Sequence, residues 1–138
     1  VLRASIPRLE QSIAYYPYDS ETHYLLGDTY LRLTSLERAP QLLPKAIRHL
    51  KRAAQLNPLS PHVYQSLAIA CWNQGKATKQ PEYLQDALQA QKEASQNFPV
   101  NPGYHEKLAE IYSALGRLEE AEEETAIAAE LAKEYHEF

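Results

Sequence analysis

Apolar residues recur at steps of three and four along almost the whole chain, which is the spacing of one face of an α-helix. Proline and glycine separate these stretches, because proline cannot continue a helix and glycine favours turns. The pattern predicts one helix at the N-terminus, through Ile6, Leu9 and Ile13, followed by three helix pairs. The expected fold class is therefore all-α, with seven helices and no strands.

The first two predicted pairs repeat with a period of 41 residues. The recurring positions are Leu26 and Leu67, Gly27 and Ala68, Pro40 and Pro81, Leu43 and Leu84, Ala46 and Ala87, Lys51 and Lys92, Ala53 and Ala94, and Pro58 and Pro99. A fixed period of about 20 to 50 residues is typical of a solenoid, whose units bury their apolar faces by stacking on one another. The expected units of this single domain, 1–138, are an unpaired helix in 1–17 and repeats in 18–58, 59–99 and 100–138.

These residues resemble the tetratricopeptide repeat, a 34-residue helix pair with Leu, a small residue and Tyr on the first helix and with Ala, Ala and Pro on the second. The matching positions are Leu26, Gly27, Tyr30, Ala46, Leu50, Ala53 and Pro58, then Tyr64, Leu67, Ala68, Ala87, Ala94 and Pro99, and finally Leu108, Ala109, Tyr112, Ala121 and Ala128. The resemblance covers nearly the whole chain. It implies a right-handed α-solenoid of antiparallel helix pairs.

Only the third unit keeps the family spacing. The small residues of its two helices, Ala109 and Ala121, lie 12 residues apart, whereas the corresponding separation in the other two units is 19 residues. Each of these units therefore contains seven extra residues. We expect the extra residues to add two turns to the second helix and to lengthen the loop before it, with Pro40 and Pro81 in the first turns.

The composition changes this picture little. The 138 residues carry a formal net charge of −4, and no apolar run approaches the roughly 20 residues needed to cross a bilayer. We therefore expect a soluble domain with no membrane insertion, in a compartment that the sequence does not determine. The sequence opens with Val1 and contains no Met, which suggests a piece of a longer protein.

The motifs of common catalytic, cofactor and metal sites are absent from the sequence. The four Gly residues are isolated, so they form no phosphate loop, and no His-Glu-x-x-His motif is present. The lone Cys71 offers no disulfide and is expected to be a small buried residue. The histidines are scattered: His23, His49, His62, His105 and His136. The sequence permits His23 and His62 to face one another across neighbouring repeats, and the alternative is hydrogen bonding at the surface or between repeats. We expect the acidic run 119–124 to be a solvated face.

The family resemblance also implies where a partner binds. Members of this family hold extended peptides or helices in a concave groove lined by the first helix of each pair. The matching groove candidates here are Glu21, Tyr24, Asp28, Leu31, Arg32, His62, Gln65, Ile69, Trp72, Asn73, Glu106, Glu110 and Ser113. Members that grip acidic C-terminal tails use basic residues and Asn where this chain has Tyr24, Asp28, Glu106 and Glu110, so that clamp is absent.

The groove candidates instead favour a protein or peptide ligand with an apolar anchor and basic flanks. The alternative is that Tyr24 and Trp72 only fill the groove. Charge is uneven along the chain, +3 over residues 1–58 and −7 over residues 103–138, which permits self-association through head-to-tail contact. The overall negative charge and the lack of a basic-aromatic pattern argue against nucleic-acid binding.

Three functions are compatible with the sequence. The first is a non-catalytic protein–protein interaction module. The second is a structural or oligomerisation segment. The third is a regulatory domain appended to an enzyme, because the string Leu56-Asn57-Pro58-Leu59-Ser60-Pro61 is similar to soluble tails of bacterial membrane polymerases or ligases of surface polysaccharide.

Overall fold

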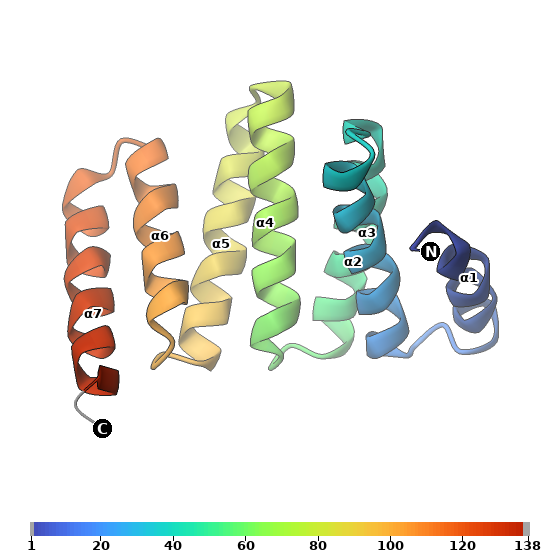
Figure 1. Ribbon diagram of the computed structural model, residues 1–138, viewed down its shortest axis with the longest axis horizontal. Coiled ribbons are helices and arrows are strands. Elements are labelled where there is room, and N and C mark those ends of the chain that lie inside the picture. Colours follow the sequence, from blue (N-terminus) through green and yellow to red (C-terminus); the bar gives the residue numbers. More distant parts are fainter. Residues whose placement is uncertain (1, 137–138) are drawn as a thin grey trace.

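The computed structural model describes the backbone of residues 2–136. Seven α-helices make up most of these residues, and they contain no strand. The helices are α1 (Ile6–Tyr15), α2 (Ser20–Leu36), α3 (Leu43–Leu56), α4 (Pro61–Thr78), α5 (Pro81–Asn97), α6 (Pro102–Ala114) and α7 (Leu118–His136). One-turn 3-10 helices precede α1 and α3, at Arg3–Ser5 and Pro40–Leu42. The helices follow one another in chain order from one end of the molecule to the other (Figure 1).

Proline determines where most of these helices begin and end. The residues that precede Pro17, Pro58 and Pro99 have φ between −129° and −144° and ψ between 70° and 81°, outside the helical region. Steric conflict with the proline ring disfavours the helical conformation for the preceding residue, so α1, α3 and α5 end in the same way. Pro61, Pro81 and Pro102 then begin α4, α5 and α6, at the position where the missing proline N–H costs no hydrogen bond.

Consecutive helices pack against one another as pairs. The most extensive contacts join α2 with α3, α4 with α5 and α6 with α7, and smaller contacts join each pair to the next. The core that runs through the stack consists of buried residues from α2 to α7, including Leu26, Leu50, Ala68, Cys71 and Ile111. Ile6, Leu9 and Ile13 of α1 are half-buried and pack against the same core. The chain is thus an all-helical solenoid with consecutive helix pairs, as the sequence predicted.

The seven extra residues are distributed differently from our expectation. Helices α2 and α4 have 17 and 18 residues, against 13 in α6, so the first helix of each long pair gains about one turn. About one turn is also added before the second helix: α5 begins six residues before Ala87 whereas α7 begins three residues before Ala121, and in the first pair the added turn is the 3-10 helix Pro40–Leu42 ahead of α3. The connection within each pair stays at two or three residues outside regular helix. The prediction of two turns on the second helix and a longer loop was therefore wrong.

The two added turns of a pair pack on each other. A Cβ atom placed on Gly75, in the added turn of α4, would lie 3.3 Å from Cβ of Tyr83 in the added turn of α5, and 3.0 Å from Cδ2 of the next residue, Leu84. Leu84 and its counterpart Leu43 lie three residues before Ala87 and Ala46, the same position that Leu118 occupies before Ala121 in the third pair, so these leucines belong to the turn that all three second helices share. Both helices lengthen together because a single added turn would have no partner against which to bury its apolar side chains.

The contact between Gly27 and Leu50 can be tested by adding one methyl group. A Cβ atom on Gly27 would lie 2.7 Å from Cγ of Leu50 and 3.1 Å from its backbone N. Gly27→Ala should therefore destabilise the fold by about 1–3 kcal/mol through overpacking, offset by at most about 1 kcal/mol of helix propensity. The measurement is the midpoint of urea unfolding. Ser35→Ala, at an exposed position of the same helix, should change it little.

The added methyl and Leu50 should also be coupled energetically. Leu50→Ala removes the side chain that obstructs the new Cβ atom, so the double variant should be less destabilised than the sum of the two single variants. Simple additivity, or a more stable Gly27→Ala protein, would contradict the assigned contact.

Candidate binding surfaces and their geometry

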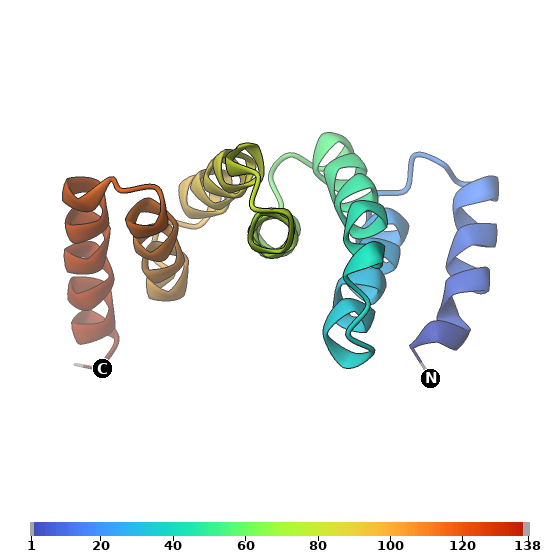
Figure 2. The same cartoon turned by 90° about the horizontal axis from the view of Figure 1, so that it is seen from above.

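The first helices α2, α4 and α6 carry the predicted groove residues, on a stack that follows a curved path when seen from above (Figure 2). Tyr24, Ile69 and Trp72 are half-buried, each packed against the core on one side. Leu31 is only 8% exposed and belongs to the core, so a ligand on this face could touch little of it. Gln65 and Asn73 are half-buried, while Glu21, Glu106 and Glu110 are exposed.

The predicted acidic character of this face is partly neutralised within the helices. Asp28 Oδ2 lies 2.9 Å from Nε of Arg32, and Glu110 Oε2 lies 3.1 Å from Nζ of Lys107. Both are pairs between residues on adjacent turns of one helix. The sequence analysis counted the carboxylates on this face without these partners, although the spacing of three or four residues indicates them.

Three features of this face were missed in the sequence. The ring of Tyr24 meets the ring of His62 edge-on, with centroids 4.8 Å apart. Lys76 Nζ lies 5.4 Å from the ring centroid of Trp72, a cation-π contact one turn further along α4. Gln65 has a side-chain oxygen, Oε1, that is buried without a hydrogen-bond partner among the described residues. Such an orphaned acceptor is unusual in a folded protein.

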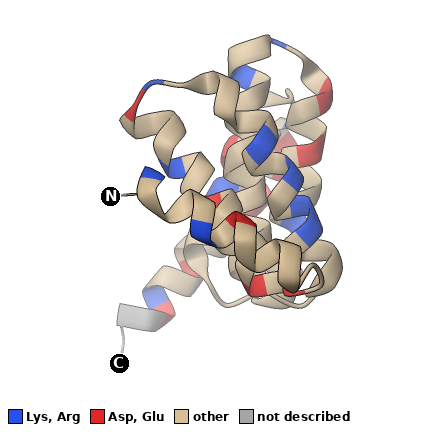
Figure 3. Ribbon diagram, turned by 90° about the vertical axis from the view of Figure 1, so that its right-hand side faces the viewer, with Lys and Arg blue, Asp and Glu red and all other residues tan. Residues whose placement is uncertain are grey.

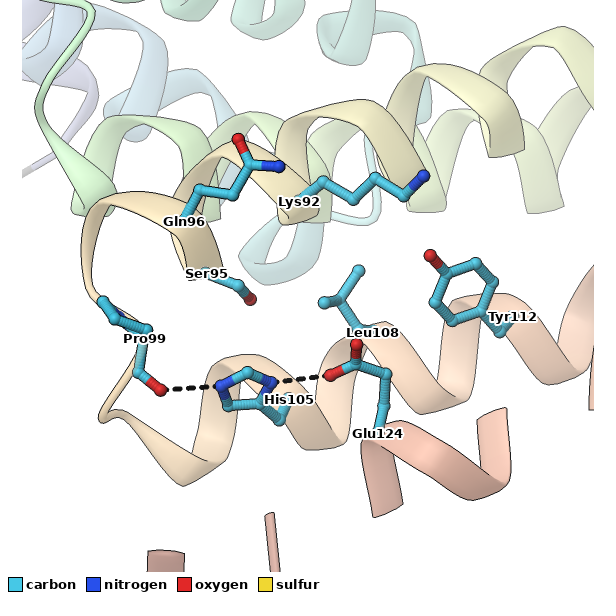
Figure 4. A pocket seen from close by; sticks show the side chains of 8 residues that line it. All are labelled: Lys92, Ser95, Gln96, Pro99, His105, Leu108, Tyr112 and Glu124. Carbon is cyan, nitrogen blue, oxygen red and sulfur yellow. Dashed lines mark hydrogen bonds and ion pairs between the residues drawn. The ribbon is translucent and has the colours of Figure 1, made fainter. Parts of the chain in front are cut away.

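Two buried histidines tie the start of a first helix to its surroundings. His105 Nε2 lies 2.7 Å from the carbonyl oxygen of Pro99, and its Nδ1 lies 2.6 Å from Oε2 of Glu124 (Figure 4). His23 repeats the arrangement, since its Nε2 lies 2.9 Å from the carbonyl oxygen of Pro17. The sequence signal was present, because each histidine lies six residues after the proline that ends the preceding helix.

His23 and His62 do not contact one another. His23 Nδ1 lies 3.4 Å from Nδ1 of His49, on the second helix of its own pair, whereas His62 contacts Ser60 and Tyr24. The acidic run is also not uniformly solvated, because Glu124 is bonded to His105 and Glu120 pairs with Arg117. The side chain of His136 lies outside the described residues.

Ser95, His105 and Glu124 have the residue types of a hydrolase triad but not its hydrogen bonds. Ser95 shares a hollow of about 340 Å³ with the His105 and Glu124 pair (Figure 4). A nucleophilic serine needs a hydrogen bond to the imidazole that activates it. The imidazole of His105 already uses Nε2 for the Pro99 carbonyl, and Ser95 Oγ has no hydrogen-bond partner among the described residues. The arrangement therefore holds two helices together and does not activate Ser95.

The other candidate chemistry is similarly limited. Cys71 is completely buried, as predicted, and burial raises the pKa of its thiol to about 12. Across the described residues, no group of three or more His, Cys, Asp or Glu could hold a metal ion. None of the described helices is both long and apolar enough to cross a membrane.

His49 makes the stability of the fold sensitive to acid. Burial, reinforced by Arg48 and His23 and opposed by Glu10 of α1, lowers the pKa of His49 from 6.5 to about 4. Between pH 6.5 and about 4, the imidazole of His49 is protonated in the unfolded chain but neutral in the folded chain. Folding stability present above pH 6.5 is therefore lost as the pH falls towards 4. After allowance for the half-exposed side chain, we expect a loss of about 1–2 kcal/mol.

The measurement is urea unfolding between about pH 7 and about pH 5, with His49→Gln as the comparison. Carboxylates and other histidines titrate in both proteins, so the difference between them isolates His49. An identical pH dependence in the two proteins would show that His49 does not contribute.

Comparison with known proteins agrees with this architecture. Two family models described as tetratricopeptide repeat match the chain, one over residues 41–97 and the other over residues 103–135. No curated protein sequence matches it. Among solved structures, MamA (MSR-1) aligns with a TM-score of 0.77 and 25% identity over 97% of this chain and 69% of its own. MamA (AMB-1) aligns with a TM-score of 0.73 and 28% identity, over 91% and 61% respectively.

A further structure, TTC0263, a thermophilic tetratricopeptide repeat protein from Thermus thermophilus, aligns with a TM-score of 0.70 over 96% of this chain and 66% of its own. At 23% identity it supports the fold alone. The chain thus spans between 61% and 69% of the length of these three structures. The two family models cover helices α3 to α7 almost completely, and the helices pack in consecutive pairs. The chain belongs to the tetratricopeptide repeat family.

Proposed function

We propose that this chain is a non-catalytic interaction module that binds a peptide or helix of a partner protein on the face formed by α2, α4 and α6. Repeats of this family generally mediate protein–protein interactions and typically have no catalytic role. The proposal adds the face, the residues and the chemical character of the ligand.

The observation that carries the proposal is the partial burial of Tyr24, Ile69 and Trp72. These side chains come from two adjacent first helices and are each half-buried against the core. Packing on one side restricts their rotamers, so a ligand that covers the other side loses little further side-chain entropy. Large, partly fixed aromatic groups of this kind are enriched among the residues that dominate binding energy.

The surrounding charges favour an apolar segment with basic flanks. Glu21 and Glu106 are exposed carboxylates, while Asp28 and Glu110 are shared with Arg32 and Lys107 on their own helices. An incoming Lys or Arg must compete with these exposed internal pairs, which are individually weak. The carboxylates should therefore influence the rate of association and its salt dependence more than the final affinity.

An oligomerisation role is the second candidate, and the ends of the stack favour it. The net charge is +3 over residues 1–58 and −7 over residues 103–138. The terminal helix α7 also exposes Leu118 and Ile127, at 62% and 41%. This reading predicts that charge reversal on α7 abolishes association while the first-helix face is unimportant. A regulatory tail of a membrane enzyme remains a third proposal, supported only by the similarity of the string around Pro58.

Selection of ligands from a displayed peptide library tests the favoured proposal. The selected peptides should share an apolar anchor next to Lys or Arg. Trp72→Ala should weaken their binding by about 2 kcal/mol or more, because the side chain is expected to be a hot spot. The dissociation constant can be measured by calorimetry. Leu59→Ala is a matched control, since Leu59 is apolar and 76% exposed but lies on the loop between α3 and α4.

The same experiment separates the two candidates. Binding that survives Trp72→Ala and Tyr24→Ala but fails after charge reversal of Glu119, Glu122 and Glu123 would overturn the proposal in favour of oligomerisation. Circular dichroism should accompany each variant, because Tyr24 and Trp72 also contact the core.

A further inference from the structure

Equivalent hollows lie along the second helices of the stack. One lining residue of each hollow lies six positions after the proline that ends the preceding helix, Pro17, Pro58 or Pro99. Another lies three positions after the small residue of the second helix, Ala46, Ala87 or Ala121. These two residues are His23 and His49 in the first repeat, Tyr64 and Ala90 in the second, and His105 and Glu124 in the third. The repeat therefore produces the same depression three times, with different side chains around it.

The hollow of the first repeat is lined almost entirely by nitrogen-bearing side chains. It has a volume of about 410 Å³. We call it the basic hollow and define it by its lining residues, His23, Arg48, His49, Lys51, Arg52 and Gln55. No carboxylate is among these described residues, whereas the equivalent hollows include Asp86 and Glu93 in the second repeat and Glu124 in the third. A cationic hollow at this position is therefore specific to the first repeat and not a consequence of the fold.

The cations of the basic hollow are only weakly compensated. Lys51 Nζ lies 3.9 Å from Asp86 Oδ2, at the outer limit of an ion pair, and both side chains are about half exposed. Arg52 donates to Gln55 Oε1 at 3.2 Å and lies over the ring of Tyr18. Glu10 of α1 is a nearby carboxylate, but it accepts a hydrogen bond from the Tyr30 hydroxyl at 3.1 Å and does not line the hollow.

The cations also repel one another. Lys51 and Arg52 lie three and four residues after Arg48 on α3, so each shares a face of the helix with Arg48, and like charges at this spacing are destabilising. A row of Lys and Arg positions along one helix is visible from the α1 end of the stack (Figure 3). An anion bound between these side chains would turn this repulsion into attraction.

The two histidines add a further donor. His23 Nε2 faces the Pro17 carbonyl and must carry a proton, which leaves Nδ1 to accept from Nδ1 of His49 at 3.4 Å. Nε2 of His49 is then the remaining imidazole nitrogen at the hollow. It can take up a proton and donate when negative charge is placed beside it.

We infer that the basic hollow binds a phosphate group. A phosphate monoester offers three terminal oxygens and nearly two negative charges, which match two guanidinium groups and one ammonium group better than a carboxylate with one charge and two oxygens. The same chemistry is available from a soluble phosphate monoester and from a lipid headgroup. The site lies on the second helix α3 and does not depend on ligand binding by the first-helix face.

Titration with inorganic phosphate at low salt, followed by NMR of the histidine and arginine side chains, tests the inference. We expect saturable shifts of His49, Arg48 and Arg52. The double variant Arg48→Gln, Arg52→Gln should weaken phosphate binding about tenfold or more, because each lost charged hydrogen bond is worth a substantial part of the affinity. The variant should remain folded, because it removes a repulsive pair from α3.

The double variant Arg38→Gln, Lys79→Gln is the matched control. It removes the same charge from exposed turns outside the hollow and should leave the affinity within about twofold. An equal loss in both double variants would show nonspecific attraction to surface charge and would overturn the inference. The absence of saturable shifts would also overturn it, as would binding of a polyglutamate peptide without binding of phosphate.

Two further arms identify the source of the phosphate. Glycerol phosphate represents a soluble monoester, and phosphatidylcholine vesicles containing phosphatidic acid represent a lipid headgroup. Binding of either that is lost in Arg48→Gln, Arg52→Gln supports the inference and assigns the source. Vesicle binding that persists in this variant would instead belong to another surface and would count against the basic hollow.

Discussion

The close approach of the two helices of a pair is the constraint on which the rest of the structure depends. Gly27 allows the side chain of Leu50 to lie against the backbone of α2, within a distance that even one added methyl group would violate. Small residues fill the corresponding positions of the later pairs, where Ala68, Ala87 and Ala121 are buried. Because each pair is held at short range, its apolar surface is too narrow to form a core alone, and stacking of pairs becomes obligatory.

This constraint also determines which surfaces remain for function. The faces between pairs are used for stacking, so the outer faces of the first and second helices are left. Tyr24 shows the compromise, since it packs on Ala53, Ala54 and Val63 while part of its ring stays accessible. A side chain in this position contributes to the stack and can still contact a partner. The structural and binding interpretations of Tyr24 are therefore compatible.

The periodicity of the sequence was sufficient to predict the helices and their pairing. Proline marks the ends of α1, α3 and α5 and the starts of α4, α5 and α6, so these boundaries were accurate. The end of α2 and α4 had no such marker. Arg38 and Lys79 adopt positive φ in the turns after these helices, where the third repeat has Gly116. Without glycine in the first two turns, the extra residues were assigned wholly to the second helix and loop, although the first helices α2 and α4 are four and five residues longer than α6.

The candidate binding surfaces were less predictable, because helical position specifies a face and not the partner of a side chain. Leu31 falls on the predicted face, yet its side chain is buried in the core. The neutralisation of Asp28 by Arg32 follows from their spacing and could have been anticipated. The hollows could not, because each combines residues from separate helices, and their positions depend on how the pairs stack.

Comparison of the three hollows shows how a repeat protein acquires different chemistry from one scaffold. Each hollow is lined by the residue three positions after the small Ala of the second helix. This residue is His49 after Ala46, Ala90 after Ala87 and Glu124 after Ala121. Glu124 satisfies its buried histidine with a charged hydrogen bond, while His49 meets His23 and two neighbouring arginines without any carboxylate in the lining. Packing requires a residue that fits at this position, but it does not require a cationic surrounding. The long Lys51–Asp86 pair and the contact of Arg52 with Tyr18 offset little of the positive charge around His49, while repulsion within α3 and the lowered pKa of His49 both oppose that charge.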